Sequence, residues 1–165
     1  DQLYSTEAGF RQALNGIYVE LNHADLYGDE LLVNTVEILA QRYKFSSMGT
    51  LTNQYHLAEF DYTTDYAKKC GSRIWEKAYA LIANVNKLLK NADSHKDLFT
   101  GDSYDLITGE AYALRAFLHF DLLRLFGPVY KTHKEDKSIC YNTQFSLSGS
   151  DLLPASKVMD DALPI

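Results

Sequence analysis

The stretch that decides the fold is Gly109-Glu-Ala-Tyr-Ala-Leu-Arg-Ala-Phe-Leu-His-Phe-Asp-Leu-Leu-Arg-Leu-Phe-Gly127, which Pro128 follows. A glycine can supply the left-handed residue that closes a helix, and a proline cannot continue one, so the stretch predicts a long helix with an abrupt end. Its apolar residues lie nearly all round such a helix: Ala113, Leu114, Phe117, Leu118, Phe120, Leu122, Leu125 and Phe126. We therefore expect residues 103–126, Phe117 included, to form an inner helix that other helices cover on more than one side.

A membrane span is the main alternative for this stretch. Charged or titratable side chains interrupt it, namely Glu110, Arg115, His119, Asp121 and Arg124. Each central charge costs about 2.5–3.5 kcal/mol on insertion into a membrane. The sequence therefore favours the buried middle layer of a helical protein.

Length and composition are those of a globular domain. The chain has 165 residues, of which 46% are hydrophobic, enough for one domain with a sizeable core. There are 22 acidic and 16 basic side chains, which gives a net charge of −6 with the basic residues scattered. This balance disfavours nucleic acid as a partner. The first residue is Asp1 rather than Met, so we expect a processed or excised piece of a longer chain.

Helical spacing recurs before and after the central stretch. A first helix, capped by Ser5 or Thr6, carries Phe10, Ala13, Leu14, Ile17, Tyr18 and Leu21 on one face, and Gly9 and Gly16 within it allow close packing. A second helix, capped by Asp29, is expected to bury Leu32, Val36, Leu39, Ala40 and Tyr43 and to form an antiparallel hairpin with the first. A third helix is expected over residues 65–91, antiparallel to the central one. In it, Asn86 lies among apolar neighbours and is expected to hydrogen-bond backbone or a side chain across the helix interface.

The remaining segments lack this periodicity. Residues 44–64 read as a long loop with interleaved aromatic residues, a kind of segment that is often functional. Residues 131–137 are a charge run typical of a solvated loop. A last helix is expected after Asp151 and Pro154, and residues 139–145 could form at most a short edge strand.

Motifs with a specific chemical reading are absent. There is no phosphate-binding glycine loop, HExxH pair, EF-hand pattern or CxxC. Cys70 and Cys140 are either buried thiols or one disulfide. The run 101–103 resembles the start of a serine-esterase block but is expected to open a helix. The acidic loop with Asp93, Asp97 and Asp102 could gather calcium but lacks the ligand spacing, so we interpret it as solvated.

A helical acid–base set is also excluded by spacing. Glu110 lies nine residues before His119, whereas side chains on one helix face meet at spacings of three or four. Asp121 and Arg124 have such a spacing and are expected to form an internal ion pair.

Two blocks of sequence resemble the SusD/RagB-type outer-membrane lipoproteins. One is the spacing of Trp75, Tyr79, Ile82, Asn86 and Leu89, and the other is the stretch 109–127 quoted above. The segment from Thr6 to Tyr18 is similar to the first helix of that family. The resemblance runs from about Ser5 to Tyr130 and covers only the N-terminal part of the family's longer chains.

The resemblance implies an all-α fold, a right-handed superhelix of antiparallel helix pairs related to tetratricopeptide repeats, over residues 1–165 as one N-terminal domain. Ala116, Phe120 and Pro128 stand at the spacing of such a repeat's second helix, although the first helix lacks the usual Leu-Gly pair. The resemblance further implies that Trp75, Arg115, Phe117, Asp121 and Arg124 are structural residues.

The resemblance also implies a function and a place in the cell. Family members bind oligosaccharides, or in some cases peptides, and pass them to a SusC-like TonB-dependent transporter without cleaving them. We therefore expect a non-enzymatic protein without a cofactor, at the surface of a Gram-negative outer membrane, held only by a lipid anchor outside this chain. The alternative is a tetratricopeptide-like scaffold that binds a protein or peptide.

Sugar recognition needs flat aromatic faces together with amide, hydroxyl or charged groups. The loop 44–64 offers this mixture, because Tyr55 and His56 could stack on a sugar while Asn53 could hydrogen-bond to it. Arg42 and Tyr43 lie at the base of the same loop. The predicted ligand-binding residues are therefore Arg42, Tyr43, Asn53, Tyr55 and His56.

Overall fold

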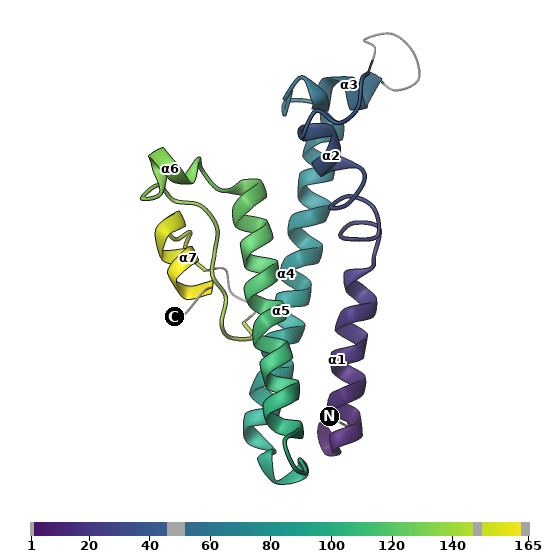
Figure 1. Ribbon diagram of the computed structural model, residues 1–165, viewed down its shortest axis with the longest axis vertical. Helices are drawn as coiled ribbons and strands as arrows, with labels where there is room; N and C mark the ends of the chain where they lie inside the picture. The colour runs from purple at the N-terminus through teal and green to yellow at the C-terminus, as the bar shows by residue number, and fades with distance from the viewer. Residues whose placement is uncertain (1, 46–51, 147–149, 163–165) are drawn as a thin grey trace. The chain divides into compact units, whose positions relative to one another are not determined.

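The structure, a computed structural model, describes residues 2–45, 52–146 and 150–162 (Figure 1). The regular secondary structure of these residues is helical and includes no strand, which confirms the all-α prediction. The elements are η1 (Gln2–Ser5), α1 (Glu7–Leu21), α2 (Thr35–Leu39), α3 (Thr52–Ala58), α4 (Asp65–Ser94), η2 (Lys96–Leu98), α5 (Ser103–Phe126), α6 (Tyr130–His133) and α7 (Ala155–Ala162). None of these helices combines the length and the hydrophobicity that a membrane span requires.

The chain divides into two compact units. The first unit comprises Asp1–Ile17 and Ala80–Ile165, and the second comprises Tyr18–Tyr79. Helices α1 and α4 contribute residues to both. The expectation of a single domain over residues 1–165 stays a prediction.

The start of α1 is set by a cap and by a glycine. The Thr6 hydroxyl accepts a hydrogen bond from the Gly9 N–H at 3.1 Å, which confirms Thr6 as one of the two predicted caps. A Cβ at Gly9 would lie 1.8 Å from the Leu3 carbonyl oxygen, so only glycine allows this approach of η1 to α1. A Cβ at Gly16 would meet open space, so the packing role expected for Gly16 is wrong.

Helix α5 has the bounds that the sequence predicts, residues 103–126, and is followed by Gly127. The predicted left-handed conformation at Gly127 is wrong, because its φ of −80° and ψ of 166° are extended. Glycine is nevertheless required there, since a Cβ would lie 2.4 Å from the Leu123 carbonyl oxygen. The Gly127 N–H donates to that same oxygen at 2.9 Å and closes the helix.

One face of α5 is exposed, which corrects the prediction that Phe117 is buried, although α4 and α7 both pack on the helix and so cover it on more than one side as predicted. Phe117 is 46% exposed and Leu106 is 59% exposed, with Ala113 also exposed between them. Six of the nine buried positions of α5 form a stripe at spacings of three and four, namely Ser103, Ile107, Ala111, Leu114, Leu118 and Leu122, and the other three, Thr108, His119 and Leu123, lie beside it. When a helix has hydrophobic residues on every side, its sequence does not show which side the neighbouring helices cover.

Two segments pack beside α5 within the first unit (Figure 1). The C-terminal half of α4 runs antiparallel to α5, as predicted, since Tyr104 bonds to Asp93 near one end and Arg115 to Asn86 further along. Helix α7 also packs on α5. Residues 139–145, for which the sequence allowed at most a short edge strand, form none, but Ser138 and Ile139 exchange backbone hydrogen bonds with Leu153 at 2.8 and 2.9 Å.

The predicted second helix is mostly wrong. Only Thr35–Leu39 are helical, and Asn34 rather than Asp29 is the N-cap residue. Residues 22–34 instead form successive turns that enclose the Glu30 carboxylate, which is 2% exposed. Leu32 and Tyr43, expected in the core, are 56% and 44% exposed. The buried Glu30 carboxylate needs partners, and these turns stand in place of most of the predicted second helix.

The predicted loop 44–64 contains a helix near its middle. Helix α3 packs against α2. Their small core consists of Ile38, Leu57 and Ala67, with Leu39, Phe45, Ala58 and Tyr66 packed on it. Residues 46–51 of that loop lie outside the described residues.

An ion pair between a buried carboxylate and a half-exposed guanidinium joins the turns of the second unit to α4. Arg73 pairs with the Glu30 carboxylate, which also accepts the Thr35 hydroxyl at 2.5 Å. Arg73 lies 3.7 Å from an Asp25 carboxylate oxygen as well. Cys70, on the same helix, is buried and does not bridge to Cys140, so the disulfide alternative is wrong.

Candidate functional site

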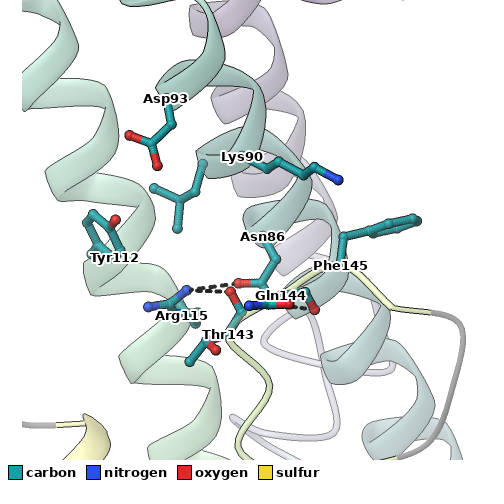
Figure 2. Close-up of a pocket in the computed structure, with 9 residues that line it drawn as sticks. Asn86, Lys90, Asp93, Tyr112, Arg115, Thr143, Gln144 and Phe145 are labelled. Atoms are coloured by element: carbon teal, nitrogen blue, oxygen red, sulfur yellow. Dashed lines mark hydrogen bonds between the residues drawn. The ribbon is translucent and has the colours of Figure 1, made fainter.

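A pocket with a volume of about 470 Å³ lies in the first unit between α4, α5 and the segment 143–145 (Figure 2). It is lined by Asn86, Leu89, Lys90, Asp93, Tyr112, Arg115, Thr143, Gln144 and Phe145. Helix α4 supplies the first four of these residues and α5 supplies Tyr112 and Arg115. Three segments that are far apart in the sequence therefore build one cavity.

Asn86 holds the base of the pocket together. Its side-chain N–H group donates to the carbonyl oxygens of Asn142 at 2.9 Å and Gln144 at 3.3 Å, and its oxygen accepts from Arg115 at 3.0 Å. Arg115 also donates to the Thr143 carbonyl at 3.2 Å. The prediction that Asn86 bonds across a helix interface is confirmed. Arg115 has the expected structural role and in addition forms part of the pocket wall.

His119 anchors the same segment from beneath. It is fully buried, its Nε2 accepts the Asn142 N–H at 3.0 Å, and its Nδ1 lies 2.8 Å from the Arg115 carbonyl. Because Nε2 is an acceptor, Nδ1 carries the proton and donates it to that carbonyl. Burial lowers the pKa of His119 to about 4, so the imidazole is neutral at pH 7. The Tyr141 ring packs on it with centroids 4.2 Å apart.

Two aromatic rings remain accessible at the pocket. Tyr112 is 49% exposed and Phe145 is 44% exposed. The Arg115 guanidinium lies 5.1 Å from the centre of the Tyr112 ring, which orients both groups. The pocket thus presents aromatic surface beside amide, hydroxyl and cationic groups.

Asp93 lies at one end of the pocket and is already engaged. Its carboxylate accepts the Tyr104 hydroxyl at 2.6 Å and lies 3.4 Å from the Lys96 ammonium. The hydrogen bond from Tyr104, together with Lys96, holds the pKa of Asp93 below its usual range. Asp93 is therefore ionised at neutral pH, and its carboxylate already has Tyr104 and Lys96 as partners.

The candidate catalytic and metal groups from the sequence do not converge. Asp121 pairs with Arg124 at 2.9 Å, as predicted, although Arg124 is 66% exposed and the pair is not internal. Ser103 opens α5 and its hydroxyl accepts from Arg11 at 2.7 Å. Within residues 2–45, 52–146 and 150–162, no three His, Cys, Asp or Glu side chains come together as metal ligands would.

The five residues predicted to bind ligand all lie in the second unit and not at this pocket. Arg42 and Tyr43 follow α2, and the Tyr43 hydroxyl donates to the Val33 carbonyl at 2.8 Å. Asn53, Tyr55 and His56 lie on α3 rather than in a loop. The rings of Tyr55 and His56 meet edge to face with centroids 5.7 Å apart, and His56 lies 3.6 Å from the Asp61 carboxylate. Their role stays a prediction.

Sequence reasoning missed the pocket residues Lys90, Tyr112, Gln144 and Phe145. Lys90 and Tyr112 are spaced on their helices like ordinary surface residues, and residues 143–145 lack any periodicity. The only signal was Asn86, a polar residue on an apolar helix face, which indicated that a polar partner lies opposite it.

Comparison with known proteins identifies the family. Residues 1–150 match a SusD-like family model described as "Starch-binding associating with outer membrane". The chain belongs to the SusD-like family. This confirms the resemblance drawn from the two sequence blocks, and the family is one of starch-binding proteins associated with the outer membrane.

Two relatives come from Formosa agariphila. SusD-like protein P2 is 26% identical over 129 residues, which are 78% of this chain and 25% of that protein. SusD-like protein P25 is 27% identical over 131 residues, 77% of this chain and 24% of that protein. The chain thus matches about a quarter of the length of these curated relatives. No solved structure gives a significant match.

Proposed function

We propose that this chain is the N-terminal helical part of a non-catalytic, cell-surface protein that binds oligosaccharide or polysaccharide. In this proposal the bound glycan is delivered to a SusC-like TonB-dependent transporter in the outer membrane. Membership of the SusD-like family supports the proposal, because the family description is starch binding associated with the outer membrane.

The pocket between α4, α5 and residues 143–145 is the observation that supports glycan binding best. Tyr112 and Phe145 offer apolar ring faces to the C–H side of a pyranose. The Gln144 amide, the Thr143 hydroxyl and the Arg115 guanidinium can hydrogen-bond to ring hydroxyls. Asn86 and His119 fix the backbone of the segment that carries two of these groups, so little order must be gained on binding.

Calorimetric titration of the full-length protein with a panel of polysaccharides tests this proposal. We expect heat of binding with at least one glycan, no release of products on chromatography, and weaker binding in Tyr112→Ala. Tyr130→Ala is the matched control, since Tyr130 is 42% exposed on α6 and does not line the pocket. Equal loss of affinity in both variants, or turnover of the glycan, would contradict the proposal.

We also propose that a second surface, in the second unit, contacts the glycan. It consists of Arg42, Tyr43, Asn53, Tyr55 and His56. A long polysaccharide can contact more than one surface of a protein. Tyr55→Ala is then expected to weaken binding of polysaccharide, measured by affinity electrophoresis. Tyr62→Ala is the control, because Tyr62 is 57% exposed in the same unit and lies outside the predicted set. Unchanged mobility of Tyr55→Ala would remove this surface from the proposal.

The partner and the place in the cell can be tested directly. We propose lipid attachment outside residues 1–165, at the surface of a Gram-negative outer membrane. Mass measurement of the N-terminal peptide of the mature protein and co-purification with a TonB-dependent transporter would test both points. A mature protein without lipid would contradict the anchoring proposal.

The exposed apolar face of α5, with Leu106, Ala113 and Phe117, favours a second candidate function. Such a face suits a scaffold that binds a protein or a peptide. A stable complex with a transporter or peptide, together with no heat from any glycan, would favour this scaffold over the glycan-binding protein.

A further inference from the structure

The side chains that line the pocket carry more positive than negative charge. Two cations, Lys90 and Arg115, line the pocket against one carboxylate, Asp93. This is unusual for a chain whose net charge is −6. The local excess of positive charge indicates a site that attracts an anionic ligand.

The carboxylate at the pocket is also more fully engaged by other residues than the two cations are. The Asp93 carboxylate accepts a hydrogen bond from the Tyr104 hydroxyl and lies beside the Lys96 ammonium. Arg115 uses one of its nitrogens for Asn86 and Thr143. The Lys90 amine has neither a hydrogen bond nor an ion pair to any residue that the structure describes. Of the two cations, Lys90 is therefore the one whose whole charged group is available to a ligand, whereas Arg115 has only part of its guanidinium left.

The direction of the Lys90 side chain supports this reading. In Figure 2 its amine extends away from Asp93 toward the side of the view where Phe145 lies. A ligand ring against the half-exposed Phe145 would thus have the ammonium group near its substituents. Thr143 and Gln144, on the same segment as Phe145, add hydroxyl and amide groups.

We propose that this pocket selects acidic oligosaccharides, with the anionic substituent of one sugar bound at Lys90 and its ring packed on Phe145. The inference rests on the proposed glycan-binding function and names the class of sugar that this site takes. An ammonium group is a point charge without a fixed fork, so it accepts a uronate carboxylate or a sulfate ester. Arg115, already held by Asn86, contributes charge and positions Tyr112.

The test compares three soluble ligands by calorimetry on the full-length protein: oligogalacturonate, a sulfated galactan oligosaccharide and a neutral maltooligosaccharide. We expect at least one acidic ligand to bind about tenfold more tightly than the neutral one, because one hydrogen bond to a charged group strengthens binding by about that factor. Lys90→Gln should remove most of that tenfold preference, because it lowers the affinity for the acidic ligand more than the affinity for the neutral one. Because exposed charges are screened, about 0.5 M sodium chloride should have the same effect as the substitution.

Lys131→Gln is the matched control, because it removes one exposed lysine of α6 outside the pocket. Circular dichroism of both variants checks that they fold. The inference is supported if Lys90→Gln loses the preference for acidic ligands and Lys131→Gln retains it. Comparison of the two acidic ligands then shows whether a carboxylate or a sulfate is preferred.

Binding of the neutral ligand as tight as that of both acidic ones would overturn the inference and leave the proposed function intact. Acidic preference that persists in Lys90→Gln would likewise overturn it. Absence of binding to every glycan, neutral or acidic, would instead overturn the proposed function itself.

Discussion

At the scale of single residues, burial separates Phe117 from its neighbour Leu118. The two side chains are similarly apolar, but Phe117 is 46% exposed whereas Leu118 is 1% exposed. The sequence predicts a core position for Phe117, where truncation to alanine costs about 3–5 kcal/mol. With half of the side chain in contact with water, the expected cost falls to about 1 kcal/mol.

This difference gives a direct prediction about stability. Leu118→Ala should lower the free energy of unfolding by about 2–5 kcal/mol, because it leaves a cavity in the stripe of α5 that faces the core. Phe117→Ala should lower it by about 1 kcal/mol. Urea unfolding of the two variants beside the parent measures both values. Equal losses in the two variants would show that the exposed face of α5 is covered.

His119 makes stability depend on pH. Its folded pKa of about 4 lies below the unfolded value of 6.5, so between these values the unfolded chain binds a proton that the folded chain does not. The free energy of unfolding should therefore fall as the pH drops from about 6.5 toward 4, by about 2 kcal/mol at pH 5 and on the order of 3 kcal/mol in full.

Urea unfolding at about pH 7 and pH 5 tests this dependence. In His119→Gln the decrease in stability between the two pH values should be smaller by about 2 kcal/mol, because no imidazole titrates. His23→Gln, which changes an exposed histidine, should retain the decrease. The same dependence in both variants would assign the pH effect to other groups.

At the scale of secondary-structure elements, two glycines of α1 have opposite roles. A Cβ at Gly9 would overlap the Leu3 carbonyl at the junction of η1 and α1, whereas Gly16 has open space around it. Both are glycines at helical positions in the sequence. Only the neighbouring backbone distinguishes a glycine that is required from one that weakens the helix.

Substitution by alanine should therefore change stability in opposite directions. Gly9→Ala forces η1 away from α1 and should destabilise by about 1–3 kcal/mol. Gly16→Ala removes a flexible residue from a helix interior and should stabilise by about 0.5–1 kcal/mol. Thermal unfolding followed by circular dichroism measures both. A Gly9→Ala variant as stable as the parent would contradict the close contact with Leu3.

At the scale of the whole molecule, contacts between distant segments decide where polar groups can be buried. Glu30 is buried in the turns of the second unit because Arg73, forty-three residues later on α4, pairs with it. Removal of the cation leaves an uncompensated carboxylate in the interior. This situation costs about 3–5 kcal/mol in fully buried pairs.

Arg73→Met should thus destabilise the protein by on the order of 2 kcal/mol, less than for a fully buried pair because the Arg73 side chain is 49% exposed. The double variant Glu30→Gln with Arg73→Met should recover part of this loss, since an amide is less costly to bury than a charge. Guanidinium unfolding of the single and double variants measures the coupling. A double variant less stable than Arg73→Met would contradict this role of the pair.

The sequence by itself determined the elements whose signals are local. Helices α4 and α5 could be predicted because apolar residues recur at helical spacing over a long stretch in each. Gly127 and Pro128 mark where α5 ends. The two motif blocks on these helices also sufficed to indicate the SusD-like family. The polar Asn86 within an apolar face correctly indicated a buried hydrogen-bond partner.

Only the tertiary structure decided the rest. The turns around Glu30 and the helix α3 depend on partners elsewhere in the chain, which spacing within a short window cannot reveal. The exposed face of α5 depends on which side its neighbours cover, and the pocket depends on residues 143–145 being held by Asn86 and His119. A local pattern records the shape that a segment prefers, whereas burial and the pairing of charges depend on which distant segments come to lie beside it.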